Sequence, residues 1–252
     1  MRTVLGIDLA SSKWSSVGTA SIEFDDETRK FTRVVPGAIR WPATPRKPTP
    51  ESLADAIDAF ARRERVCAVA LDGPQGWRDP ATPEGTLGVG RRCEYACRTQ
   101  GKTGAHPRTY PGPQRGWIEF CIDTFARLLT RPDVALSEPG IRDAVAGGYL
   151  VLECFPTSAW RSSGLVPLPG KSKKPDLEPY RHSLTAAFGL PSFSVVSHDD
   201  LQAVVAALTA AAAAGGPASP LPKGTPASLI AHPDGRPRRV EGYIWDVEPR
   251  PG

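Results

Sequence analysis

Three acidic side chains lie at the ends of short apolar segments, and this placement favours metal chemistry. Asp8 closes TVLGIDL, Asp72 follows VCAVAL, and Glu153 lies in YLVLEC. Such runs are typical of buried strands, and carboxylates at the ends of neighbouring strands meet at one sheet edge. Their repulsion is relieved by hard cations such as Mg²⁺ or Mn²⁺. Two ions roughly 4 Å apart would support phosphoryl transfer. The alternative is that each acid is a local turn or helix cap.

A fourth acid stands at the start of a helix predicted over residues 197–214. Leu201, Val204 and Leu208 share one face of this helix, and Asp199 lies on another face with alanines 203, 206 and 210. A helix that is apolar on both faces is buried, and a face of alanines can approach a sheet closely. Asp199 would then point inward, either as a metal ligand or as a partner of the helix dipole. Ser197 and Asp200 are explained as a helix cap.

The elements that must position these acids form a mixed sheet with flanking helices. Strands over 17–24 and 31–35 predict an antiparallel three-strand meander with the first strand, followed by a Pro-rich connector at 36–50. Helices are expected over 50–63, 117–129 and 178–188, and a short strand over 242–245. Residues 73–148 are predicted to be a loop-rich insert with one helix. The order favours one α/β domain over residues 1–252.

Composition excludes several classes of protein. The chain has 252 residues, of which 40% are hydrophobic, with a net charge of +4. These values exclude a fully disordered chain and permit nucleic-acid partners. No window reaches the roughly 18 apolar residues of a membrane span, and the first residues lack a signal-peptide layout. We therefore expect a cytoplasmic protein without a membrane partner.

Two basic segments are candidate nucleic-acid contacts. Between Tyr95 and Ile118 there is no acid, and cations alternate with aromatic residues such as Trp117. Cations contact phosphates, and aromatic rings stack on the bases of single strands. The alternative is a solvated loop. The predicted contacts are Arg98, Lys102, Arg108 and Arg115, with Lys171, Lys173 and Lys174 in a second cluster.

The ordered motifs GIDLASSKW, ALDGPQGW, RRCEYACR, LECFP, HDDLQAVVAALTA and EGYIW cover nearly the whole chain. In this combination the chain resembles the family catalogued as domain of unknown function four-two-nine, a group of predicted RNase H-like nucleases. The resemblance implies an RNase H-like fold and metal-dependent phosphodiester hydrolysis. The positions that match the family pattern are Asp8, Asp72, Glu94, Glu153, His198 and Asp199.

The resemblance also suggests roles for two further positions. Glu94 would be a further ligand or would orient the attacking water. Gln202 stands where the family pattern has a second aspartate, and an uncharged amide should hold a cation more weakly.

The predicted function is therefore a nuclease or phosphodiesterase that uses Mg²⁺ or Mn²⁺. Asp8, Asp72, Glu153 and Asp199 would be the ligands, and Glu94 would complete the catalytic set. An alternative is a weakened or inactive protein of the same fold that binds nucleic acid or protein. A less favoured alternative is a relative of actin-like sugar kinases, with Ser11 and Ser12 contacting phosphate. Those kinases are longer and contain two duplicated halves, which this chain does not show.

Overall fold

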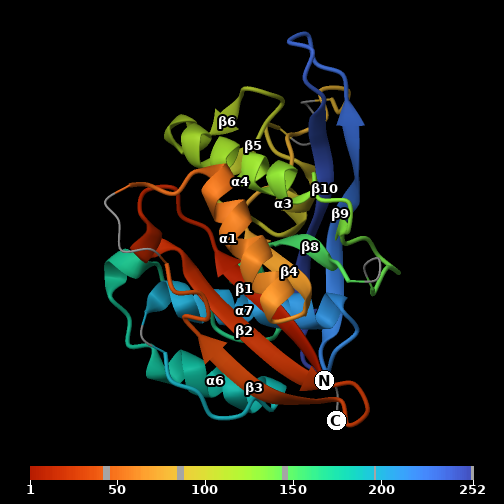
Figure 1. Ribbon diagram of the computed structural model, residues 1–252. Helices are drawn as coiled ribbons and strands as arrows, with labels where there is room; N and C mark the ends of the chain where they lie inside the picture. Colours follow the sequence, from red (N-terminus) through yellow and green to blue (C-terminus); the bar gives the residue numbers. More distant parts are fainter. Residues whose placement is uncertain (42–45, 84–87, 144–146, 196, 251–252) are drawn as a thin grey trace.

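A mixed β-sheet forms the centre of the computed structural model, which describes residues 1–41, 46–83, 88–143, 147–195 and 197–250 (Figure 1). Parts of the predicted connector and insert therefore lie outside the described residues. The strand order is β3-β2-β1-β4-β8-β10-β9, and β7 pairs with β8. The strands are β1 (Arg2–Asp8), β2 (Gly18–Asp25), β3 (Lys30–Pro36), β4 (Val66–Asp72), β7 (Val134–Leu136), β8 (Tyr149–Cys154), β9 (Ser219–Ile230) and β10 (Arg238–Glu248).

The sheet confirms the predicted topology. Strands β1, β2 and β3 form an antiparallel meander, and β4 and β8 continue the sheet parallel to β1. Asp8 is in register with Asp72, and Glu153 is in register with Leu71. The strands that carry the three predicted acids are therefore neighbours, and their carboxyl ends share one edge.

Helices cover both faces of this sheet (Figure 1). On one face of the sheet, apolar side chains of β1, β4 and β8 pack against α1 and α4. On the other face, apolar side chains of the same strands pack against α7. The longer helices are α1 (Pro50–Arg63), α4 (Arg115–Leu128), α6 (Glu178–Phe188) and α7 (His198–Ala213). The helix α7 agrees with the predicted span to within one residue, and Ser197 caps it by accepting the Asp200 N–H.

The close approach of α7 to β1 depends on a glycine. A Cβ at Gly6 would lie 2.1 Å from the Ala203 carbonyl oxygen and 2.3 Å from the Ala207 nitrogen. Only glycine in the strand and small residues on the helix permit this backbone contact. Because side chains alternate along a strand, Asp8 lies on the same face as Gly6 and is directed towards the first turn of α7.

Several short elements and a long hairpin were not predicted from the sequence. The tail forms the paired strands β9 and β10, whereas only residues 242–245 were expected to be extended. The segment of β9 does not resemble a strand in sequence because it contains prolines 220, 222 and 226. These prolines are tolerated because β9 is an edge strand. The other short elements are η1 (Trp14–Ser16), α3 (Arg92–Ala96), β5 (Lys102–Thr103), β6 (Thr109–Tyr110), η2 (Gly112–Gln114), α5 (Pro156–Ser162) and η3 (Lys171–Lys173).

The described helices include no candidate membrane span. Across the described ranges, no helix combines the length and the apolar character that a bilayer crossing requires.

Candidate metal centre and adjoining cleft

Asp8, His198 and Asp199 bring three ligand atoms together. One oxygen of each carboxylate and one imidazole nitrogen lie within 4.8 Å of one another. Asp8 comes from the end of β1, and the other two residues form the start of α7. The Gly6 contact sets this distance, because it fixes how closely α7 lies over β1. The group can hold one divalent cation.

Asp72 joins this group through Asp8. The two residues are register partners on adjacent parallel strands, so their carboxyl groups lie on the same face of the sheet and interact electrostatically. Burial raises the pKa of Asp72 to about 7, and the charge of Glu153 adds to this effect. Burial also raises the pKa of Asp8 well above its usual range, assisted by the charges of Asp72 and Asp199. Clustered carboxylates repel one another, and a bound cation would offset this repulsion.

His198 is held with one ring nitrogen available. Its Nε2 lies 2.9 Å from the Pro169 carbonyl oxygen, which can only accept, so Nε2 carries the proton in the neutral ring. The lone pair of Nδ1 then faces the acidic group, with Asp199 Oδ1 at 3.3 Å. Histidines that bind a metal commonly donate their other ring N–H to a backbone carbonyl in this way.

Lys171 places a positive charge of the chain itself beside this group. Its ammonium forms an ion pair with Asp199 Oδ2, although the lysine side chain remains 59% exposed. Burial opposes ionisation of Asp199, but its hydrogen bond and ion pair with Lys171, together with the adjacent His198 ring, outweigh it and lower the pKa of this carboxyl group. Lys171 was predicted to contact nucleic acid, and here it neutralises one of the candidate metal ligands.

Glu153 and Glu94 lie outside this group of ligands and clamp a buried arginine. Arg91 Nη2 lies 2.6 Å from Glu153 and 3.1 Å from Glu94, and all three side chains are at most 4% exposed. The Gln75 N–H donates to Glu153 Oε2, and the Thr103 N–H donates to Glu94. This differs from the metal role expected for Glu153 and the catalytic role expected for Glu94. The reason is alternation: Glu153 pairs with Leu71 and faces the side opposite to Asp72.

Gln202 also has a partner. Its Oε1 accepts a hydrogen bond of 2.9 Å from the Trp160 Nε1–H, and Trp160 is fully buried. Gln202 lies one turn after Asp199, so it is close to the acidic group while its amide oxygen is engaged.

A cleft of about 650 Å³ adjoins the metal group through Asp72 and Gln202. Its lining includes the buried Arg91 network, three exposed cations and two half-buried aromatic rings. The cations are Arg98, Arg161 and Lys173, and the rings are Trp117 and Phe155. Arg161 belongs to α5, which the sequence analysis did not predict, so its contribution could not be foreseen.

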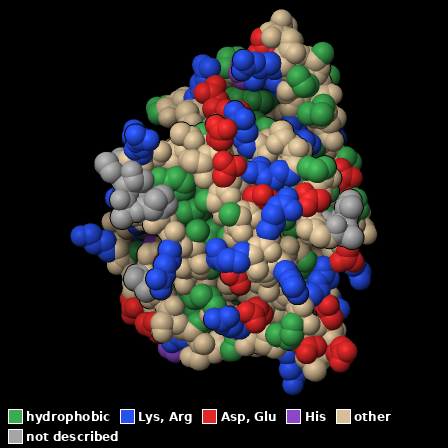
Figure 2. Space-filling view, in the orientation of Figure 1, with side chains coloured by type: hydrophobic (Ala, Val, Ile, Leu, Met, Phe, Trp, Pro, Cys, Tyr) green, Lys and Arg blue, Asp and Glu red, His purple; other side chains and the backbone are tan. Residues whose placement is uncertain are grey.

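The predicted nucleic-acid residues divide into two groups. Only Arg98 and Lys173 of the seven line the cleft. Lys102 donates to the Thr99 carbonyl and lies over the Tyr95 ring, and Arg115 pairs with Glu119. Arg108 and Lys174 are exposed at other positions. On the face that carries α1, cations and acids are interspersed over the described surface (Figure 2).

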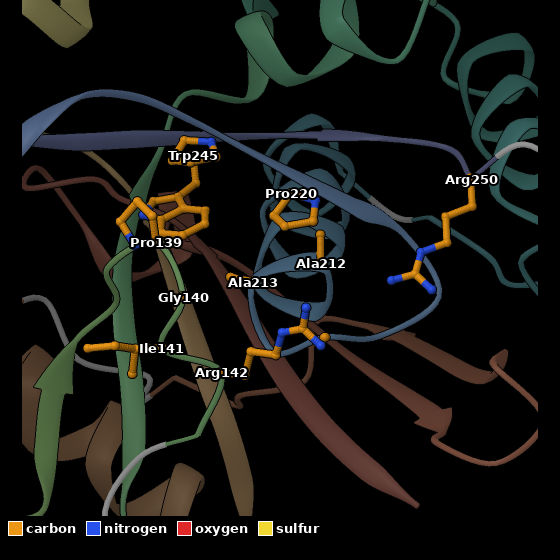
Figure 3. Close-up of a pocket in the computed structure, with 11 residues that line it drawn as sticks. Pro139, Gly140, Ile141, Arg142, Ala212, Ala213, Pro220, Trp245 and Arg250 are labelled. Carbon is orange, nitrogen blue, oxygen red and sulfur yellow. The ribbon is translucent and has the colours of Figure 1, made fainter.

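A second, smaller cavity of about 170 Å³ lies beside the last turn of α7. Figure 3 shows Arg142 and Arg250 at this cavity, with Trp245 and prolines on its walls. It contains none of the predicted site residues.

The fold and the acids define the class of this molecule. An antiparallel meander continued by parallel strands, with acids on neighbouring strands and on the covering helix, makes this a mixed α/β protein. The chain belongs to the family described as "Protein of unknown function (DUF429)", whose model matches residues 6–227. This confirms the resemblance found in the sequence.

No curated protein matches the chain. A similar solved structure is that of Thermus thermophilus RuvC, with a TM-score of 0.39 and 14% identity, covering 85% of this chain and 97% of that chain.

Proposed function

We propose that this protein is a divalent-metal-dependent phosphodiesterase that acts on nucleic acid. The observation that carries the proposal is the convergence of Asp8, His198 and Asp199 within 4.8 Å, with Asp72 as the register partner of Asp8 on the adjacent strand. Carboxylate oxygens suit Mg²⁺ and Mn²⁺, whereas imidazole suits transition metals. The mixed set therefore favours Mn²⁺ over Mg²⁺.

The residues of the chain would divide the work as follows. Asp8, Asp72, Asp199 and His198 Nδ1 would hold the cation, and Pro169 would keep the imidazole oriented. A bound divalent cation polarises a phosphoryl oxygen and makes a coordinated water more acidic. Arg98, Arg161 and Lys173 would hold the phosphate backbone at the cleft.

Glu153 and Glu94 have a different role in this proposal. Each holds Arg91 in the wall of the cleft, and together they keep the loop before α3 against the end of β8. They act as positioning residues, because their carboxylate oxygens are engaged by the guanidinium and by backbone N–H groups.

The experiment is a cleavage assay with Mn²⁺ or Mg²⁺ on single-stranded, duplex and branched DNA and RNA. We expect metal-dependent cleavage that Asp8→Asn and Asp199→Asn each reduce by at least about 100-fold, because each removes a charged ligand. Asp79→Asn is the matched control, since Asp79 lies away from both the ligand group and the cleft lining.

The same assay tests the alternative of a protein that binds without turnover. That alternative rests on Gln202, which is uncharged and bonded to Trp160. Salt-sensitive binding without cleavage under either metal would support it and would contradict the catalytic proposal. ATP hydrolysis stimulated by a sugar would instead support the kinase alternative, although neither Ser11 nor Ser12 is among the residues that line the cleft.

A further inference from the structure

The size of the cleft limits what can reach the metal group. Its volume of about 650 Å³ is in the range of small-ligand sites. Asp72 is the member of the ligand group that lines this cleft. A duplex is too wide to enter such a space, since its major groove alone is roughly 12 Å across. A phosphate can approach Asp72 from this side only when its nucleotide is unpaired.

The charges in the cleft are arranged by depth. Glu94 and Glu153 are buried and share Arg91, whereas Arg98, Arg161 and Lys173 are exposed. The Arg161 guanidinium is anchored by donating to the Cys97 carbonyl oxygen. The exposed charges that line the cleft are therefore positive and Asp72 is half-buried, which suits an anionic backbone entering towards a cation.

Aromatic rings and amides complete the lining. Trp117 and Phe155 are half-buried, and Trp117 is fixed because its Nε1–H donates to the Leu9 carbonyl oxygen at 3.1 Å. Gln100 and Gln114 also line the cleft. Fixed rings offer stacking surfaces to any base, and amides can bond to exposed base edges.

The backbone of Arg98 permits a clean removal of its side chain. This residue has a φ of +53° after the end of α3, and its N–H donates to the Tyr95 carbonyl. Glycine is the usual residue at such a position because it adopts positive φ without strain. A glycine at this position therefore removes the charge at the cleft without adding backbone strain.

We propose that the cleft binds one unpaired nucleotide, with its phosphate between Arg98, Arg161 and Lys173 and its base against Trp117 or Phe155. This inference rests on the proposed function and narrows its substrate class to single-stranded nucleic acid. The same chemistry would be presented by a free nucleotide, and the experiment separates these two sources.

The test measures binding without metal, so that it does not depend on catalysis. Fluorescence anisotropy in EDTA follows a labelled oligothymidylate, its duplex with oligoadenylate, and competition by thymidine monophosphate. The principal variant is Arg98→Gly. Its matched control is Arg65→Gly, because Arg65 has a φ of +52°, donates its N–H to a carbonyl three residues before it, and precedes β4 at the opposite end from Asp72.

We expect both variants to melt at or above the temperature of the parent chain, because glycine relieves strain at positive φ. Arg98→Gly should weaken single-strand binding about tenfold, through loss of a charged contact. The slope of log affinity against log salt should fall by about 0.7. Arg65→Gly should bind like the parent chain. Arg161→Gln provides a second loss of charge and should also weaken binding.

The outcomes separate this inference from the proposed function. Binding that is lost in Arg98→Gly supports the cleft even if no metal-dependent cleavage is found. Parent-like affinity in both Arg98→Gly and Arg161→Gln, or duplex binding as tight as single-strand binding, would overturn the inference even if cleavage is found. Displacement of the oligomer by thymidine monophosphate assigns the cleft to a free nucleotide, and failure to displace it assigns the cleft to a strand.

Discussion

Gly6 and Ala203 bring strand β1 and helix α7 into backbone contact, with only 2.1 Å between a Cβ placed on Gly6 and the Ala203 carbonyl oxygen. This contact lies two residues before Asp8 and about one turn after Asp199. The distance between the two candidate ligands is therefore set by packing in the core.

Gly6→Ala should destabilise the fold and weaken metal binding together. The added methyl group meets backbone, so α7 must move away from β1, at a cost of about 3 kcal/mol. Gly116→Ala is the control, because Gly116 lies in α4 with nothing near its Cβ position, and helix propensity predicts a gain of about 0.5–1 kcal/mol. Urea denaturation measures the stability of both variants, and titration calorimetry measures their Mn²⁺ affinity. Equal stability of Gly6→Ala and the parent chain would show that α7 is not held by this contact.

Stability of the metal-free protein should fall as pH rises from about 4 to 7. The pKa of Asp72 is raised to about 7 from an ordinary 3.8, so the folded state binds a proton that the unfolded state has lost. The loss is on the order of 4 kcal/mol and is complete above the folded pKa.

Asp72→Asn should remove this part of the pH dependence and raise stability at pH 7.5 in EDTA. Asp199 has a lowered pKa and the opposite sign, and the raised pKa of Asp8 depends in part on the charge of Asp72, so the comparison of variant and parent reports on the Asp8–Asp72 pair. Thermal melting across pH is the measurement. A pH profile unchanged by Asp72→Asn would mean that this carboxyl group is ionised without cost in the folded protein.

The ligand atom of His198 can be distinguished by amide substitutions. Asparagine places its amide near the position of Nδ1, whereas glutamine places it near Nε2, which donates to Pro169. His198→Asn should therefore retain more Mn²⁺ affinity than His198→Gln, which should lose about 10- to 100-fold. Titration calorimetry checks this order, and the reverse order would assign Nε2 as the ligand atom.

Adding charge at Gln202 should tighten metal binding. Gln202→Glu keeps an oxygen for the Trp160 N–H and adds a negative charge one turn from Asp199, and Gln202→Asp adds the same charge on a shorter chain. We expect about a tenfold gain in Mn²⁺ affinity. Trp160→Phe removes the hydrogen bond to Gln202 and tests whether this bond alone affects Mn²⁺ affinity. Unchanged affinity in both acidic variants would remove Gln202 from the site.

Removing Arg91 should be strongly destabilising. Arg91→Met leaves Glu94 and Glu153 buried without a counter-charge, which costs about 3–5 kcal/mol. Adding Glu94→Gln and Glu153→Gln to Arg91→Met should recover most of the loss. Denaturant titration of the single and triple variants tests this, and a single variant as stable as the parent would show that the three charges are not buried together.

The sequence predicted the sheet well because its central strands have simple apolar patterns. It also predicted that the alanine face of α7 would approach the sheet closely, as the contact with Gly6 confirms, and Asp199 is buried at the start of this helix. It did not predict the position of Glu153, because an acid near a strand end does not reveal which face it occupies. That depends on register, and Glu153 aligns with Leu71 while Asp72 aligns with Asp8. The partner role of Arg91 depends on contacts distant in sequence, which no local pattern carries.

The most direct test of the metal group is an anomalous difference map from a crystal of the protein soaked in Mn²⁺. We expect one strong peak bounded by Asp8, His198 and Asp199, and no such peak in Asp8→Asn crystals prepared in the same way. A map without a peak between β1 and the start of α7, or with manganese bound elsewhere only, would contradict the account.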